Sequence, residues 1–250
     1  MTLMTFAILG LAALASGMLS AIAGNGGLII LPVLLILGIP PQIALGTNRL
    51  YTTSSLSMST YYFIKKGLFN PHFWIATIIA TLVGTVIGVG LIHLFSNSTL
   101  KLLLPILMLA MAAYLLLPLK LIFSVKAPVA HNSAQGLTAS SLLGVYSGFL
   151  GAGTGSLWTT VAVSMFNMDI MEASAISRFM CFISNALALC IFMGLHQVNY
   201  SLGSILALGG MLGAYLGSRL AFRWGAKFTR FILISSTLIM AVQLAFEYWV

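Results

Sequence analysis

The chain has 250 residues, of which 60% are hydrophobic and only 6% are charged. Soluble domains average about 25% charged residues and disordered chains need low hydrophobicity, so both classes are excluded. The net charge of +8 comes from eleven Lys and Arg against three acidic residues. In a membrane protein such residues orient the loops, so we expect no nucleic-acid partner. The sequence predicts an all-α polytopic membrane protein.

Hydropathy predicts about eight hydrophobic segments, some of which glycine or proline divides into shorter pieces. In chain order the pieces are 3–23, 28–38, 43–64, 73–95, 100–119, 135–150, 156–167, 173–194, 201–221 and 229–249. A helix needs about 20 residues to cross a bilayer, so 28–38, 135–150 and 156–167 are too short. Because irregular backbone at membrane depth occurs only inside protein or beside water, these short pieces are the first candidates for a site.

A polar linker over 120–134 divides the chain into two similar halves, 1–119 and 135–250. A shift of 127 residues aligns four pairs: Gly17 with Gly144, Ser20 with Ser147, Gly24 with Gly151, and Gly26 with Gly153. A shift of 129 aligns seven more: Ala44 with Ala173, Arg49 with Arg178, Ser55 with Ser184, Asn70 with Asn199, Gly84 with Gly213, Gly88 with Gly217, and Lys101 with Arg230. We therefore predict a duplication.

Basic residues predict how the halves are oriented. They cluster at Lys65/Lys66, at Lys120/Lys126 and at Arg219/Arg223/Lys227, and the positive-inside rule assigns all three clusters to the cytoplasm. The linker is then cytoplasmic and both termini are periplasmic. Each half contains a Gly-broken re-entrant hairpin (3–38 or 135–167) followed by three transmembrane helices, so the two repeats are inverted. Pairs of short oblique crossings remain an alternative to hairpins, and 3–23 is long enough to cross fully.

Two glycine-rich tips lie between the arms of these hairpins. The first contains Gly24, Asn25, Gly26 and Gly27, and the second contains Gly151, Gly153, Thr154 and Gly155. The arm after each tip begins a short helix, whose first amides and dipole favour anions. Because glycine in membranes also allows helices to pack closely, the case for a site depends on two clusters at equivalent positions.

A second pair of motifs follows the hairpins. The first is Thr47-Asn48-Arg49, and the second contains Ser177 and Arg178. Arginine inside a span is costly unless it faces a cavity or a partner, although near a helix end it can also extend to the interface. An unpaired guanidinium suits an anionic ligand. Polar residues follow on the same spans, namely Thr52, Thr53, Ser54, Ser55, Ser57, Ser59 and Thr60, and later Ser184 and Asn185. Many of these are expected to bond back to their own helix.

Other chemistry lacks the residues it needs. No acid lies deep in a predicted span, and His72, His131, His196 and His93 lie in loops or near a span end. We therefore expect no metal site, no cofactor, no nucleophilic catalysis and no carboxylate proton relay.

The motifs resemble those of the TauE/SafE sulfite exporter family over nearly the whole chain. The resemblance rests on Gly17-x-x-Ser20-x-x-x-Gly24-x-Gly26-Gly27 with Pro32, on Ala44 to Asn48, on Tyr62 to Gly67, and on Gly144 to Gly155 with Ala173 to Arg178. It implies a permease of the bacterial inner membrane for sulfite, organosulfonates or related small anions. The family's usual extra glycine is Asn25 here, and the substrate does not follow from the resemblance.

The function predicted is secondary transport, in the export direction, of a small sulfur-containing oxyanion by alternating access at a midplane site. The expected partners are this small anionic substrate and the lipid bilayer, and a homodimer is left open. The alternative is a membrane-embedded enzyme or partner subunit that acts on a lipid or small molecule. Asp169 and Glu172 are the acids it would use. A cation channel or metal permease is third, because the predicted spans lack acids.

Overall fold

The computed structural model describes residues 3–23, 26–68, 70–116 and 129–220, and every element in these ranges is helical. The helices are α1 (Leu3–Ala23), α2 (Gly27–Ile36), α3 (Pro41–Lys65), η1 (Pro71–Trp74), α4 (Ile75–His93), α5 (Asn97–Leu116), α7 (Ala134–Phe149), α8 (Thr154–Ser164), α9 (Ile170–Gly194) and a helix over Tyr200–Leu220. The all-α prediction is confirmed for this part of the chain. The predicted segment 229–249 and most of the linker lie outside the described residues.

Three of the described helices are long and apolar enough to cross a membrane, namely Pro71–His93, Ile170–Gly194 and Tyr200–Leu220. α3 has 25 residues and corresponds to the predicted span 43–64, but Ser and Thr side chains make it less apolar. By contrast, α2 and α8 have only 10 and 11 residues. At 1.5 Å per residue they extend about 15 Å, roughly half of the hydrocarbon thickness, so each begins within the bundle rather than at its end.

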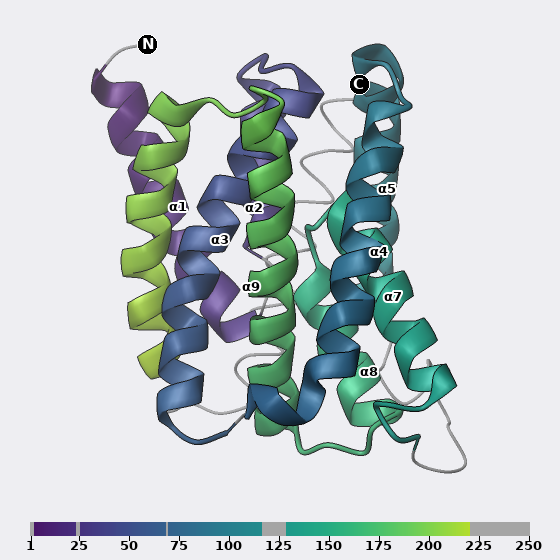
Figure 1. Cartoon of the computed structure of the whole chain (residues 1–250). Helices are drawn as coiled ribbons and strands as arrows, with labels where there is room; N and C mark the ends of the chain where they lie inside the picture. Colours follow the sequence, from purple (N-terminus) through teal and green to yellow (C-terminus); the bar gives the residue numbers. More distant parts are fainter. Residues whose placement is uncertain (1–2, 24–25, 69, 117–128, 221–250) are drawn as a thin grey trace.

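The long helices define two ends of the bundle (Figure 1). We call them the His93 end and the Lys65 end, after one residue at each. At the His93 end, the start of α3, the end of α4 and the turn after α9 are joined by side-chain hydrogen bonds. At the Lys65 end, Trp74 before α4 contacts Phe166 after α8. α3 and the helix Tyr200–Leu220 run away from the His93 end, whereas α4 and α9 run towards it.

The two short-helix pairs approach the middle from opposite ends. α1 runs parallel to the helix Tyr200–Leu220, since Gly10 faces Ile205 and Gly217 faces Met18. α1 therefore starts at the His93 end, and α2 leads back to it (Figure 1). α7 runs parallel to α4, so it starts at the Lys65 end, to which α8 returns.

Each half of the chain packs its first helix against the other half. A Cβ added to Gly84 of α4 would overlap the carbonyl oxygen of Ser141 in α7, and one added to Gly213 would overlap that of Leu14 in α1. The same holds for Gly88 with Val145 and for Gly217 with Met18. Small residues let these backbones approach closely, as is usual between helices in membranes. The shift of 129 pairs Gly84 with Gly213 and Gly88 with Gly217, so the paired glycines make matching contacts in the two halves.

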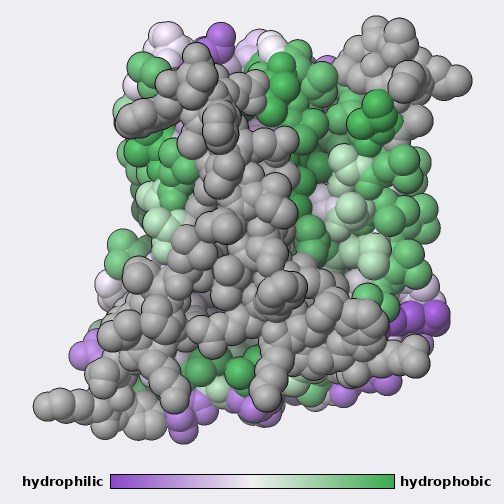
Figure 2. Space-filling model, turned by 180° about the vertical axis from the view of Figure 1, so that it is seen from behind, coloured by the Kyte–Doolittle hydropathy of each residue, from purple (hydrophilic) through white to green (hydrophobic). Residues whose placement is uncertain are grey.

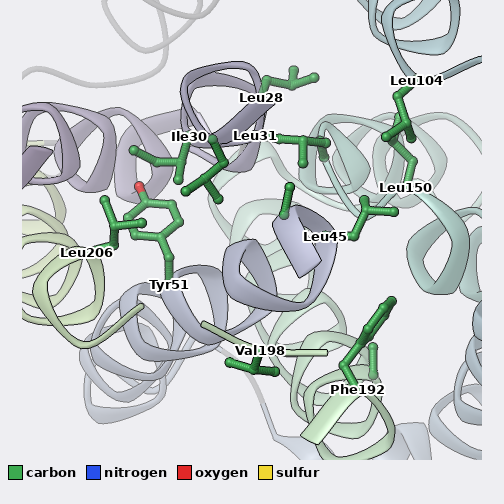
Figure 3. Packing of buried hydrophobic residues seen from close by; sticks show 14 of the residues in the cluster. Leu28, Ile30, Leu31, Leu45, Tyr51, Leu104, Leu150, Phe192, Val198 and Leu206 are labelled. Carbon is green, nitrogen blue, oxygen red and sulfur yellow. The ribbon is translucent and has the colours of Figure 1, made fainter. Parts of the chain in front are cut away.

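The interior around α2 is a hydrophobic core. Leu28, Ile30, Leu31 and Leu34 of α2 are fully buried, and α2 has no polar face. Figure 3 shows Leu28, Ile30 and Leu31 in one cluster with Leu45 of α3 and with side chains of later elements, namely Phe192, Val198 and Leu206. A helix that is hydrophobic all round belongs inside a protein, which agrees with the position of α2 in this core.

The outer surface is apolar around the waist of the bundle. Large hydrophobic side chains are exposed along α4, α5 and the helix Tyr200–Leu220, including Ile79, Val83, Leu102, Ile106, Leu208 and Leu212. On the face shown in Figure 2, the described residues at mid-height are mostly hydrophobic, and hydrophilic ones gather near the upper and lower edges. Such a surface is far larger than the apolar patches of soluble monomers and suits contact with lipid.

Candidate functional site

The glycine tips mark where the short helices begin. Gly26 precedes α2 and Gly27 starts it, while Gly24 and Asn25 lie outside the described residues. In the second tip, Gly151 and Gly153 have φ of +71° and +81°, a backbone region that glycine enters without a steric penalty. Thr154 and Gly155 then open α8. These two left-handed residues turn the chain sharply from α7 into α8.

The two tips lie against each other in the interior. A Cβ built on Gly27 would be 3.7 Å from the Cα of Ala152, which lies between the glycines of the second tip. The same Cβ would be 3.2 Å from Nδ2 of Asn48 and 3.1 Å from Cγ2 of Thr52. The first tip, the second tip and the α3 motif are far apart in the sequence, but they meet at one place in the fold.

Arg49 lies beside this meeting point and is only 1% exposed. Its Nη1 donates to Oδ1 of Asn185 at 2.9 Å, and its Nη2 donates to the carbonyl oxygen of Gly148 at 2.7 Å. The Nε of Arg49 is buried and has no hydrogen-bond partner among the described residues. Gly151 lies directly on the guanidinium, because a Cβ there would overlap Nη1. Glycine at this position is therefore required for both its φ and its small size.

Arg178 makes the corresponding contacts with the other half and is 3% exposed. Its Nε donates to the carbonyl oxygen of Ala21 at 3.0 Å, its Nη2 donates to the same oxygen, and its Nη1 donates to that of Ser174 at 2.6 Å. The guanidinium carbon also lies 4.3 Å from the centre of the Phe63 ring. Each arginine thus holds the C-terminal carbonyls of the other half's first helix, α7 or α1.

Carbonyl dipoles face the charge of both arginines. The last carbonyls of a helix carry partial negative charge, and within the described part of the chain the oxygens that accept from Arg49 are all neutral. Asp169 and Glu172 are exposed at the start of α9, where Asp169 caps the helix by accepting from the amide of Met171. A neutral cage only partly replaces the water that a buried cation loses, so the centre of the bundle favours a negative charge.

Several other predicted polar residues lie at this centre. Asn48 is 2% exposed and its Oδ1 has no partner among the described residues, and the same is true of the buried Oγ of Ser147. Ser177 donates to the carbonyl oxygen of Gly155 at 2.6 Å and so joins the second motif to the second tip. Thr154 and Gly155 are the first residues of α8, where backbone amides have no intrahelical acceptor. Buried polar atoms without partners usually indicate water or a ligand.

Thr47 does not point to the tips. It donates to Ile43 and accepts from the amide of Asn199 at 2.9 Å, so it holds the turn after α9. The predicted back-bonding of hydroxyls is confirmed for several others, including Thr52 to Asn48 and Ser184 to Met180.

Two features of the site were not singled out by the sequence. Asn185 accepts from both Arg49 and Thr52, although the sequence named it only among the polar residues that follow the arginines on the same spans. Tyr51 donates to Ser16 at 2.7 Å, and Ser16 donates to the carbonyl oxygen of Gly26 at 2.8 Å, which fixes the first tip. A buried amide and a buried hydroxyl within apolar segments are the only signals that would have found them.

Within the described ranges, no group of three or more His, Cys, Asp or Glu residues lies close enough to hold a metal ion. The arrangement therefore offers guanidinium groups, amides and hydroxyls, which recognise oxyanions.

Comparisons with known proteins point the same way. The family model of the sulfite exporter TauE/SafE matches residues 9–244. A "Probable membrane transporter protein" of Haemophilus influenzae is 31% identical over 96% of this chain and 94% of its own length. "Probable membrane transporter protein ORF9" of Sinorhizobium sp. is 32% identical over 95% and 91%, and YfcA of Escherichia coli K12, also a probable membrane transporter protein, is 29% identical over 96% and 89%. No solved structure gives a significant match.

Proposed function

The chain belongs to the TauE/SafE sulfite exporter family, and we propose that it exports a small sulfur-containing oxyanion, such as sulfite or an organosulfonate. It is a multi-pass membrane transporter, as the apolar helices and the names of its relatives indicate. The identity of the anion, the direction of transport and the site are our proposals.

The observation that carries the proposal is the buried positive charge of Arg49 at the meeting point of the tips. Among the described residues, its Nε has no hydrogen-bond partner, and the oxygens that accept from its Nη atoms are neutral. An anion beside Gly27, Asn48 and Gly151 would neutralise this charge. It would also accept from the first amides of α8, which have no intrahelical acceptor, and the helix dipole there adds a favourable potential. Charge, free donors and glycine-lined backbone thus coincide at one place.

We infer that the two halves are inverted repeats and that transport uses their symmetry. Their first helices start at opposite ends of the bundle, and each arginine holds the end of the other half's first helix. An anion that replaces the helix carbonyls as the acceptor of a guanidinium's hydrogen bonds would loosen the hairpin that this arginine holds. Movement of the two hairpins in alternation would then open the site to one side at a time.

The proposed direction follows from energy. An interior-negative potential favours the exit of an anion by about 2.3 kcal/mol per charge per 100 mV, so export requires no carboxylate relay. The orientation proposed has the Lys65 end in the cytoplasm of a bacterial inner membrane and both termini in the periplasm. The exposed Lys65 and Lys66 at this end, together with Arg219, support it through the positive-inside rule.

A thermal-shift screen of the purified protein tests the proposal. Sulfite, sulfate, thiosulfate and small sulfonates are added singly, and a ligand of the folded form raises the melting temperature. We expect at least one of these anions to stabilise the wild type, Arg49→Lys to keep part of the effect, and Arg49→Gln to lose it. Arg219→Gln, which removes an exposed arginine, is the control and keeps the full shift. A full shift in folded Arg49→Gln would contradict the site.

A further inference from the structure

A chain of side-chain hydrogen bonds closes the His93 end of the bundle. It contains Gln42 at the start of α3, Gln197 in the turn after α9, and His93, the last residue of α4. Nε2 of Gln42 donates to the carbonyl oxygen of Phe95 at 3.4 Å, and Nε2 of Gln197 donates to Oε1 of Gln42 at 3.4 Å. Oε1 of Gln197 then lies 3.0 Å from Nε2 of His93. Three elements are thus linked through a single row of polar atoms.

Both ends of this row are acceptors. One end is the carbonyl oxygen of Phe95, and the other is the carbonyl oxygen of Val89, which lies 2.8 Å from Nδ1 of His93. A backbone carbonyl can only accept, so Gln42 must present its amide nitrogen to Phe95 and its oxygen to Gln197. Gln197 must in turn present its oxygen to His93. Both ring nitrogens of His93 therefore face an oxygen acceptor.

Only the imidazolium form of histidine has two N–H donors. With a neutral ring, one contact in the row would join two acceptors, and turning either glutamine amide would only move this mismatch to another contact. The mismatch disappears when one proton is added. The ring also lies in the last turn of α4, where the carbonyl end of the helix dipole favours a positive charge.

We propose that His93 binds a proton in this conformation and that this proton fastens the His93 end of the bundle. The described acids on the surrounding helices are Asp169 and Glu172, which lie at the opposite end of α9. The other titratable or charged groups described on the packed elements are Arg49, Tyr51, Tyr61, Tyr62 and Lys65 of α3, Lys101 and Tyr114 of α5, Tyr146 of α7, Arg178, Cys181 and Cys190 of α9, His196 beside Gln197, and Tyr200, Tyr215 and Arg219 of the last described helix. The proton is held by carbonyl and amide oxygens rather than by a carboxylate.

The proton site adjoins the candidate anion site. A Cβ added to Gly46 would overlap the carbonyl oxygen of Gln197, and the hydroxyl of Thr47 accepts from the amide of Asn199. The turn that carries Gln197 thus packs on the residues that precede Asn48 and Arg49. Loss of the proton would weaken the attachment of this turn to α4 and favour opening at the His93 end. The inference concerns the empty protein and stands without the proposed substrate.

Thermal unfolding of the full-length protein in detergent, without added anion, tests the proposal across pH 5.5 to 8.5. A stabilising proton contributes at low pH, and its contribution is lost as the pH rises. As the pH rises, the melting temperature of His93→Gln should therefore fall less than that of the wild type, with a difference of roughly 3–12 °C, the expected effect of one hydrogen bond to a charged group. The control is His72→Gln, which changes an exposed histidine at the Lys65 end and should behave as the wild type.

A second variant and a direct measurement complete the test. Gln197→Glu would place a carboxylate against His93 and should move the fall in melting temperature to higher pH. A ¹⁵N spectrum of the histidine-labelled wild type should show both ring nitrogens of His93 protonated at the lower pH values, where the wild type has its higher melting temperature. A neutral His93 ring over the whole pH range would overturn the proposal. So would a pH response of folded His93→Gln equal to that of the wild type.

Discussion

Gly151→Ala is the substitution that most sharply tests the packing of the second tip on Arg49. The change has two costs. Alanine at a φ of +71° costs about 1–2 kcal/mol in the left-handed region. The new Cβ would also overlap Nη1 of Arg49, and it would displace the guanidinium from Asn185 or from Gly148. A lost hydrogen bond to a charged group costs about 1.5–3 kcal/mol.

Gly67→Ala is a matched control for the first of these costs. Gly67 has a φ of +72°, but a Cβ there would meet nothing within 4 Å. The control should therefore lose only about 1–2 kcal/mol, whereas Gly151→Ala should lose about 3–5 kcal/mol. At about 2–4 °C per kcal/mol for a chain of this size, the two variants should differ by several degrees in melting temperature.

The comparison is made by thermal unfolding in detergent at one pH and without added anion. A Gly151→Ala protein as stable as Gly67→Ala would show that the guanidinium does not lie against the tip. The geometry of the proposed site would then be wrong.

Three further substitutions test other contacts. Tyr51→Phe removes the hydroxyl that fixes the first tip and should cost about 1 kcal/mol in unfolding free energy, whereas Tyr61→Phe, at an exposed position, should cost nothing measurable. Gly84→Ala should prevent close packing of α4 on α7 and reduce the yield of folded protein in size-exclusion chromatography, whereas Gly90→Ala, which meets no atom within 4 Å, should not. Burial lowers the pKa of His131, so protonation opposes folding and stability should be lost as the pH falls below about 6.5. His131→Phe, which can still stack on Trp74, should lose less on acidification in a pH series of melting curves, and an equal loss would contradict the assignment.

The helices and the glycine tips were predictable from the sequence because both leave local patterns. Apolar length predicted α3, α4 and α9, and glycine clusters predicted where α2 and α8 begin. The pairing of Gly84 with Gly213 also corresponds to matching places in the fold, where each glycine lies against the other half's first helix.

The partners of the buried groups were not predictable. Arg49 holds the carbonyl of Gly148, 99 residues away, and Asn185, 136 residues away. Sequence spacing indicates the depth of a side chain in a helix but not which distant helix faces it. For the same reason, the row from Gln42 to His93 leaves no motif, because its members come from three separate elements.

The central claim is that the buried guanidinium groups and the glycine tips bind an anion in transit. Electrogenic transport in proteoliposomes tests this claim most directly. With sulfite or the anion identified by thermal shift, wild-type protein should carry a current that follows the anion gradient and the membrane potential. Arg49→Gln with Arg178→Gln should abolish the current, and Arg219→Gln should leave it intact. An undiminished current from the folded double variant would contradict the account.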